Sequence, residues 1–258
     1  MKSGVLRFDD WTNPVPPAGR EVVSVTPEEP DPEGTPLLFV PGLGHGAWAF
    51  AEHWLPRAAA RGFAAHALTP RRDGGLRAHV HDVVQVAASL PRQAVLIGHG
   101  TGALVVAYAL GRYPARAAVL SAPVLDGWAT VGAALRTNPA GTLPALLGGR
   151  LRLSRRQLFS PAMPDERARE ILGRLDARPR RELVTHGPPP RPVGDPPVLV
   201  VGSPDDRVVP RASLDRTAAR YGGAPLLFPG MGHDLMLDVA RAEPIEAIVD
   251  WLVKEPAA

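Results

Sequence analysis

Two titratable residues that could do chemistry, Asp206 and His233, each follow a short apolar run of the chain. One run ends at Val201 and the other ends at Phe228. A carboxylate and an imidazole brought together are the side chains of general acid–base catalysis. Because short apolar runs predict buried strands, we expect both residues just beyond the ends of strands.

A glycine-rich turn follows another apolar run, at residues 94–97, and leads into apolar residues at helical spacing up to Leu110. Gly98, Gly100 and Gly102 occupy every second position of this turn. The pattern predicts a buried strand, a sharp turn and a helix. Glycines at the turn let the helix pack closely on the strand.

Short apolar strands alternate with helices along the chain, which predicts an α/β fold with a mostly parallel central sheet flanked by helices. Sites in such sheets lie at the carboxyl ends of the strands, where Leu43, Gly100, Asp206 and His233 all fall. The predicted strands cover residues 5–8, 21–25, 37–40, 63–68, 94–97, 117–120, 197–201 and 225–228. The predicted core helices end at residue 60 or cover residues 76–90, 213–221 and 244–253.

The composition excludes several classes of protein. The 258 residues are 45% apolar, enough for one sizeable core, and no apolar run is long enough to span a membrane. Residues 1–10 lack the apolar stretch of a secretory signal, so we expect a cytoplasmic protein. A formal charge of only +3 does not indicate a protein that binds nucleic acid. There is no cysteine and no histidine–carboxylate cluster at metal spacing, so we expect no metal and no cofactor.

From about residue 36 onward the chain resembles the α/β-hydrolase family, whose four motifs it carries in the family's order. The loop at residues 39–48 is similar to the oxyanion loop, with Pro41 where the family often has histidine. The turn Gly98-His99-Gly100-Thr101-Gly102 resembles the nucleophile elbow, Gly-x-Ser-x-Gly. Residues 200–210 resemble the loop of the triad acid, and residues 228–236 resemble the loop of the catalytic histidine.

This resemblance implies a role for each matching residue. His233 would be the catalytic base, and Asp206, which fits the motif better than Asp205, would hold one of its nitrogens. Asp126 also follows a predicted strand and is a second candidate for the acid. The backbone N–H groups of Leu43 and Thr101 would stabilise a developing oxyanion.

Gly100 stands where the family has its serine nucleophile. Because glycine has no side chain, no covalent acyl intermediate can form at this position. Thr101 is a poor replacement, since it lies one residue further round a tight turn and its hydroxyl is expected to point away from the pocket.

Three interpretations of the missing serine remain open. The first is an enzyme that uses His233 and Asp206 as a non-covalent acid–base pair, which covers a lyase, an isomerase, a cyclase or direct hydrolysis. The second is a serine hydrolase or esterase inactivated at residue 100. The third is a non-catalytic ligand-binding protein on a hydrolase scaffold.

The loosely patterned segment from residue 126 to residue 195, called the cap segment below, is expected to be a helical cap or lid inserted into a core domain of residues 1–125 and 196–258. Its arginines could bind an acidic substrate or a carrier protein, or they could be ordinary solvated side chains. We expect a small substrate of apolar or aromatic character. The residues that could line its pocket, or could instead be ordinary core or loop residues, are His45, Trp48, His99, Trp128 and Met231.

Overall fold

The computed structural model describes residues 21–254, with gaps at residues 30, 32–33, 72–73, 180 and 184. The strand expected at residues 5–8 therefore lies outside the described residues.

Within the described residues, the strands form one seven-stranded sheet in the order β1-β3-β2-β4-β5-β6-β7. Only β1 runs antiparallel to its neighbour, and the other pairings are parallel, as the alternation of strands and helices predicts. The strands are β1 Glu21–Val25, β2 Leu37–Val40, β3 Ala65–Thr69, β4 Val95–His99, β5 Ala117–Ser121, β6 Val198–Gly202 and β7 Leu226–Leu227.

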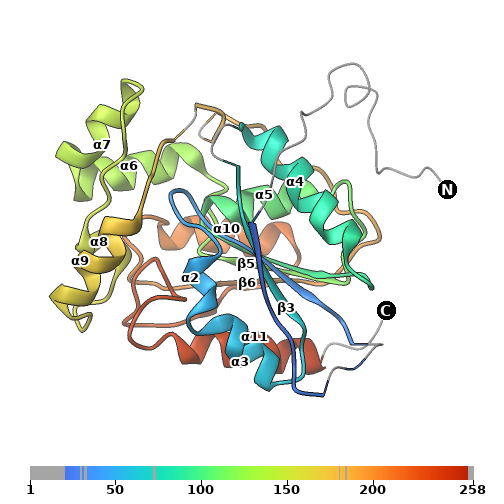
Figure 1. The fold of residues 1–258 in the computed structure, drawn as a ribbon. Helices are drawn as coiled ribbons and strands as arrows, with labels where there is room; N and C mark the ends of the chain where they lie inside the picture. The colour runs from blue at the N-terminus through green and yellow to red at the C-terminus, as the bar shows by residue number, and fades with distance from the viewer. Residues whose placement is uncertain are drawn as a thin grey trace.

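Helices cover both faces of this sheet, and the two faces carry separate hydrophobic clusters (Figure 1). Successive side chains of a strand point to opposite faces, so Leu37 and Phe39 of β2 join one cluster, whereas Leu38 and Val40 join the other. The first face carries α2 Trp48–Ala51, α3 Trp54–Ala60 and α11 Ala242–Lys254, and the second carries α4 Leu76–Ser89 and α5 Thr101–Ala109. The remaining core helix, α10 Arg211–Arg220, contributes Leu214 to the first cluster and Ala218 to the second.

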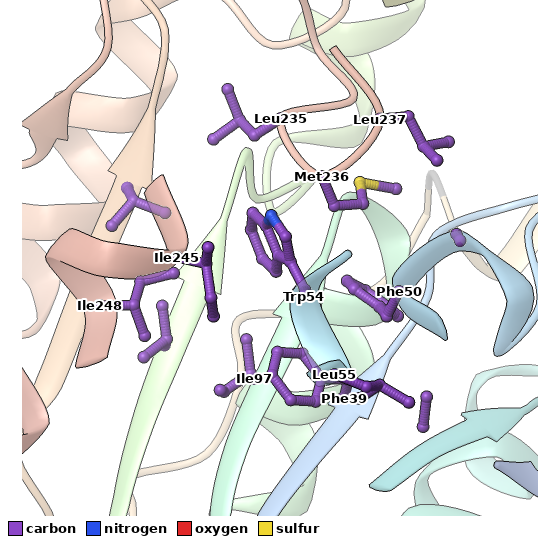
Figure 2. Packing of buried hydrophobic residues seen from close by; sticks show 14 of the residues in the cluster. Phe39, Phe50, Trp54, Leu55, Ile97, Leu235, Met236, Leu237, Ile245 and Ile248 are labelled. Carbon is purple, nitrogen blue, oxygen red and sulfur yellow. The ribbon is translucent and has the colours of Figure 1, made fainter. Parts of the chain in front are cut away.

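The fully buried indole of Trp54 packs between the sheet and the loop that follows His233 (Figure 2). Its ring lies 6.2 Å from the Phe39 ring and 5.7 Å from the Phe50 ring, and Met236 belongs to the same cluster. The indole Nε1 donates to the backbone carbonyl of Arg241 at 2.8 Å. This packing holds the histidine loop against the body of the fold.

The cap segment lies between β5 and β6 and holds α6 Gly127–Thr137, α7 Pro139–Leu146, α8 Arg155–Leu158 and α9 Asp165–Arg174 (Figure 1). Contacts with the site loops hold it in place. The backbone N–H of Asp176 donates to the carbonyl of Gly44 at 3.3 Å, and the N–H of Asp234 donates to the carbonyl of Leu158 at 2.9 Å. The predicted cap segment therefore borders both the oxyanion loop and the histidine loop.

Within the described residues, no helix has both the length and the apolar character that crossing a membrane requires.

Candidate active site

The imidazole of His233 and the carboxylate of Asp206 meet at the carboxyl edge of the sheet, although 27 positions separate them in sequence. Asp206 Oδ2 accepts a hydrogen bond from His233 Nδ1 at 2.8 Å. The other carboxylate oxygen, Oδ1, accepts from the backbone N–H groups of Val208 and Val209 at 2.7 and 3.0 Å. The loop therefore fixes the carboxylate, and the carboxylate fixes the imidazole with its Nε2 lone pair free to accept a proton.

Burial by itself lowers the pKa of His233, but the charge of Asp206 and its hydrogen bond outweigh that effect, and the pKa lies above its ordinary value of 6.5. The side chain of Asp206 is fully shielded from solvent, and that of His233 is 7% exposed. The Coulomb attraction between the two groups is therefore weakly screened.

Gly100 lies directly before α5 with φ +56° and ψ −119°. An ideal Cβ atom built on Gly100 would lie 3.3 Å from Nε2 of His233 and 3.7 Å from Cα of Gly42. The position where the family carries a nucleophile thus faces the free nitrogen of the imidazole.

The two backbone N–H groups expected to act as donors belong to Leu43 and Thr101, which follow Gly42 and Gly100 in the chain. The N–H of His45 donates to the carbonyl of Gly42 at 3.1 Å in a tight turn. Because a trans peptide directs its N–H opposite to its C=O, the N–H of Leu43 points away from that turn. Thr101 is the first residue of α5, where a helix leaves its N–H without a partner inside the helix.

A cavity of about 300 Å³ is lined by Gly42, Leu43 and Thr101, whereas Gly100 and His233 do not line it. His45 and Trp48 line the same cavity, with ring centroids 5.6 Å apart. Its wall contains apolar side chains, such as those of Leu68 and Val105, as well as charged ones.

The other residues expected in the pocket lie elsewhere. His99 is buried beneath the site, where its ring centroid lies 4.8 Å from that of His233. Met231 lines a second cavity, between α8 and the histidine loop. Trp128 is 68% exposed on α6 and lines none of the described cavities. The structure does not bring Trp128 to the site.

The two acids considered as alternatives to Asp206 also have other partners. Asp126 caps α6 by accepting from the N–H of Ala129 at 3.1 Å, and it pairs with Arg216 at 2.5 Å. Asp205 accepts from the N–H of Gly230 at 2.7 Å. Among the described residues, neither carboxylate has a hydrogen bond to His233.

A buried carboxylate beside the site, that of Asp234, was not predicted from the sequence. Its Oδ2 atom lies 3.0 Å from Nε2 of His45, and its Oδ1 atom lies 3.6 Å from Nε2 of His99. Burial raises the pKa of this carboxyl, but His45, together with His99 and His233, lowers it below its usual range. Burial, followed by the nearby charge of His233, lowers the pKa of His99 to about 3, so His99 is neutral at physiological pH.

Asp238 was missed as well. Its side chain accepts from the N–H groups of Gly232, Ser160 and Val239, and from the hydroxyl of Ser160, at 2.6 to 2.8 Å. This carboxylate fastens the cap segment to the histidine loop. The sequence feature that could have indicated both carboxylates is their position, four residues apart, in the otherwise apolar stretch after His233.

Comparisons with known proteins support the fold. The sequence profile of the Alpha/beta hydrolase family matches residues 37–251. No curated protein matches the chain.

Several solved structures share the fold. A thermophilic esterase from Thermogutta terrifontis has 15% identity and a TM-score of 0.66, with 91% of this chain and 93% of that chain covered. The esterase EaEST from Exiguobacterium antarcticum has 14% identity and a TM-score of 0.65, with 91% and 96% covered. The esterase RhEst1 from Rhodococcus sp. ECU1013 has 21% identity and a TM-score of 0.64, with 92% and 96% covered. By its sequence profile, its sheet and the order of its site loops, the chain belongs to the α/β-hydrolase family.

Proposed function

We propose that this protein is an enzyme that acts on a small carbonyl or ester substrate by general acid–base catalysis, without a covalent acyl intermediate. The observation that supports this proposal is the placement of His233. Its Nδ1 atom is held by Asp206 at 2.8 Å, and its Nε2 atom faces the position beside Gly100. An imidazole held in this way is a general base for whatever proton donor reaches its free nitrogen.

Direct hydrolysis is the simplest reaction for this arrangement. A water molecule beside Gly100 gives a proton to Nε2 of His233 while its oxygen forms a bond to the substrate carbonyl carbon. The carbonyl electrons move to the oxygen, and the N–H groups of Leu43 and Thr101 stabilise the oxyanion. Collapse of the tetrahedral intermediate breaks the ester bond, and His233 returns the proton to the leaving alcohol. Each such backbone donor typically contributes roughly 10²–10³ in rate.

A second candidate, a serine hydrolase inactivated at its nucleophile, is favoured by the backbone of Gly100. Its φ of +56° is unfavourable for residues other than glycine, yet it directs the built Cβ atom toward His233. This backbone supports the second candidate, because a side chain at residue 100 would point toward the imidazole. This candidate predicts an inert protein that regains ester hydrolysis when serine is restored.

Hydrolysis of p-nitrophenyl acetate by the unaltered protein, by His233→Gln and by Gly100→Ser separates these candidates. Non-covalent catalysis predicts turnover by the unaltered protein that is lost in His233→Gln, and no labelling by a fluorophosphonate probe. Inactivity of the unaltered protein, with turnover and labelling only in Gly100→Ser, would overturn the proposal in favour of the inactivated hydrolase. Inactivity of all three toward this and longer esters would count against both.

A further inference from the structure

The cavity beside the oxyanion donors contains a cation that the catalytic proposal does not use. Arg174, in the last turn of α9, lines this cavity from the cap segment. Its guanidinium carbon lies 4.0 Å from the ring centroid of Trp48, the last residue of the oxyanion loop. The contact therefore joins the cap segment to the core across the cavity wall.

The other charges in this wall already have partners. Arg71 pairs with Asp82 at 2.5 Å. Asp176 accepts from Arg150 at 2.6 Å and lies 3.3 Å from Nε of Arg178.

A carboxylate at the edge of the sheet, that of Glu21, accepts from the Thr69 hydroxyl at 2.6 Å. In the part of the chain that the structure describes, Arg174 is the arginine of this wall that has no acidic partner. No carboxylate of the described residues lies within 4.0 Å of its guanidinium nitrogens.

A guanidinium that is stacked on an aromatic ring can still bind an anion. The ring contacts the face of the guanidinium, and its N–H groups, which lie in the plane, remain able to donate. Two parallel N–H groups match the two oxygens of a carboxylate. The contact with Trp48 restricts the orientations of this exposed guanidinium, which reduces the entropy lost when a ligand binds.

We propose that this cavity takes a carbonyl substrate that carries a second, anionic group, a carboxylate, and that Arg174 binds this group. The reacting carbonyl would lie at Leu43 and Thr101, which line the same cavity. A volume of about 300 Å³ restricts the ligand to a small molecule. This inference rests on the proposed function for the identity of the site, but it concerns binding and can be measured without turnover.

The test is calorimetric titration of the unaltered protein with the monoamides of succinate, glutarate and adipate, each compared with its neutral diamide. Amides resist hydrolysis, so the measurement reports binding even if the catalytic proposal fails. We expect at least one monoamide to bind about tenfold to hundredfold more tightly than its diamide, since a hydrogen bond to a charged group is typically worth roughly this factor. Arg174→Gln should abolish that preference.

Two further variants distinguish binding of the carboxylate by Arg174 from a general effect of the protein's net charge. Arg169→Gln removes an exposed arginine of the same helix that lines none of the described cavities, and it should leave the preference unchanged. Arg174→Lys keeps the charge but loses the planar fork, and it should keep only part of the preference. Equal affinity for monoamide and diamide, no binding of any member, or an unchanged preference in Arg174→Gln would each overturn the proposal.

Discussion

Nε2 of His233 lies 3.3 Å from the point that a Cβ atom on Gly100 would occupy. This distance is short for a Cβ contact, and Gly100 also has a positive φ of +56°. The residue beside the imidazole is thus confined by its neighbour and by its own backbone. Glycine meets both constraints because it has no Cβ atom.

Gly100→Ala should lower the free energy of unfolding by about 1–3 kcal/mol, because an L-residue is strained at this φ. Gly173→Ala is the matched control, since Gly173 lies within α9 and a Cβ there meets nothing within 4 Å. The control should be neutral or stabilise by up to about 1 kcal/mol. Urea denaturation of both variants measures the difference, and equal effects would contradict the assignment of strain to residue 100.

The acid limb of the rate–pH profile should have its midpoint above pH 6.5. A general base works only when it is deprotonated, and Asp206 raises the pKa of His233. In Asp206→Asn the charge that raises this pKa is gone while the burial that lowers it remains, so the midpoint should move to lower pH. The maximal rate should fall by roughly 10²–10⁴-fold. Steady-state hydrolysis between pH 5 and pH 9 measures both effects.

Asp126→Asn serves as the control for that experiment. Its carboxylate caps α6 and pairs with Arg216, so the substitution should cost about 1 kcal/mol of stability or less and leave the profile unchanged. A profile that moved in Asp126→Asn but not in Asp206→Asn would transfer the role of the acid to Asp126.

Stability should fall as the pH is lowered from 6.5, because of His99. Its pKa in the folded protein is about 3, whereas the unfolded chain binds this proton near pH 6.5. Between these values the unfolded state holds one more proton at this residue, which destabilises the fold by about 1.4 kcal/mol per pH unit. His233 does not contribute well below pH 6.5, because both the folded and the unfolded state then bind its proton.

His99→Gln should reduce the slope of unfolding free energy against pH by about that amount between pH 6.0 and pH 4.5. The amide can still donate to the backbone carbonyl of His233, as His99 Nε2 does at 3.1 Å. Urea titrations at a series of pH values give the slope. An unchanged slope would mean that His99 is protonated in the folded protein.

Asp238→Asn should destabilise the protein by about 1–3 kcal/mol and impair catalysis as well. An asparagine amide has one oxygen in place of two, so it cannot accept both from the N–H groups of Gly232 and Ser160 and from the N–H of Val239, and a donor of this cluster loses its acceptor. Gly232 precedes His233, so movement of this loop should also displace the imidazole. Thermal unfolding measures the loss of stability, and the hydrolysis rate measures the loss of activity. An active variant of unchanged stability would show that Asp238 does not hold the cap segment to the histidine loop.

Much of the fold could be predicted from local sequence patterns. The sheet strands predicted at residues 37–40 and 117–120 correspond to β2 and β5, and the turn around Gly100 joins β4 to α5 as expected. The helix predicted to end at Ala60 is instead two helices, α2 and α3. His53, between them, has a φ of −135°, outside the helical range, and apolar periodicity does not reveal such a local break.

The candidate site, like the fold, was predicted from the sequence only in part. The sequence alone determined the order of the strands along the chain and the residues that follow their carboxyl ends, because apolar periodicity and glycine positions act over a few neighbouring residues. Only the tertiary structure decided which of these side chains meet. His45 and Asp234 are 189 positions apart, and His233 and Asp206 are 27 apart. Such contacts depend on the order of strands in the sheet and on the packing of the cap segment, which no local pattern encodes.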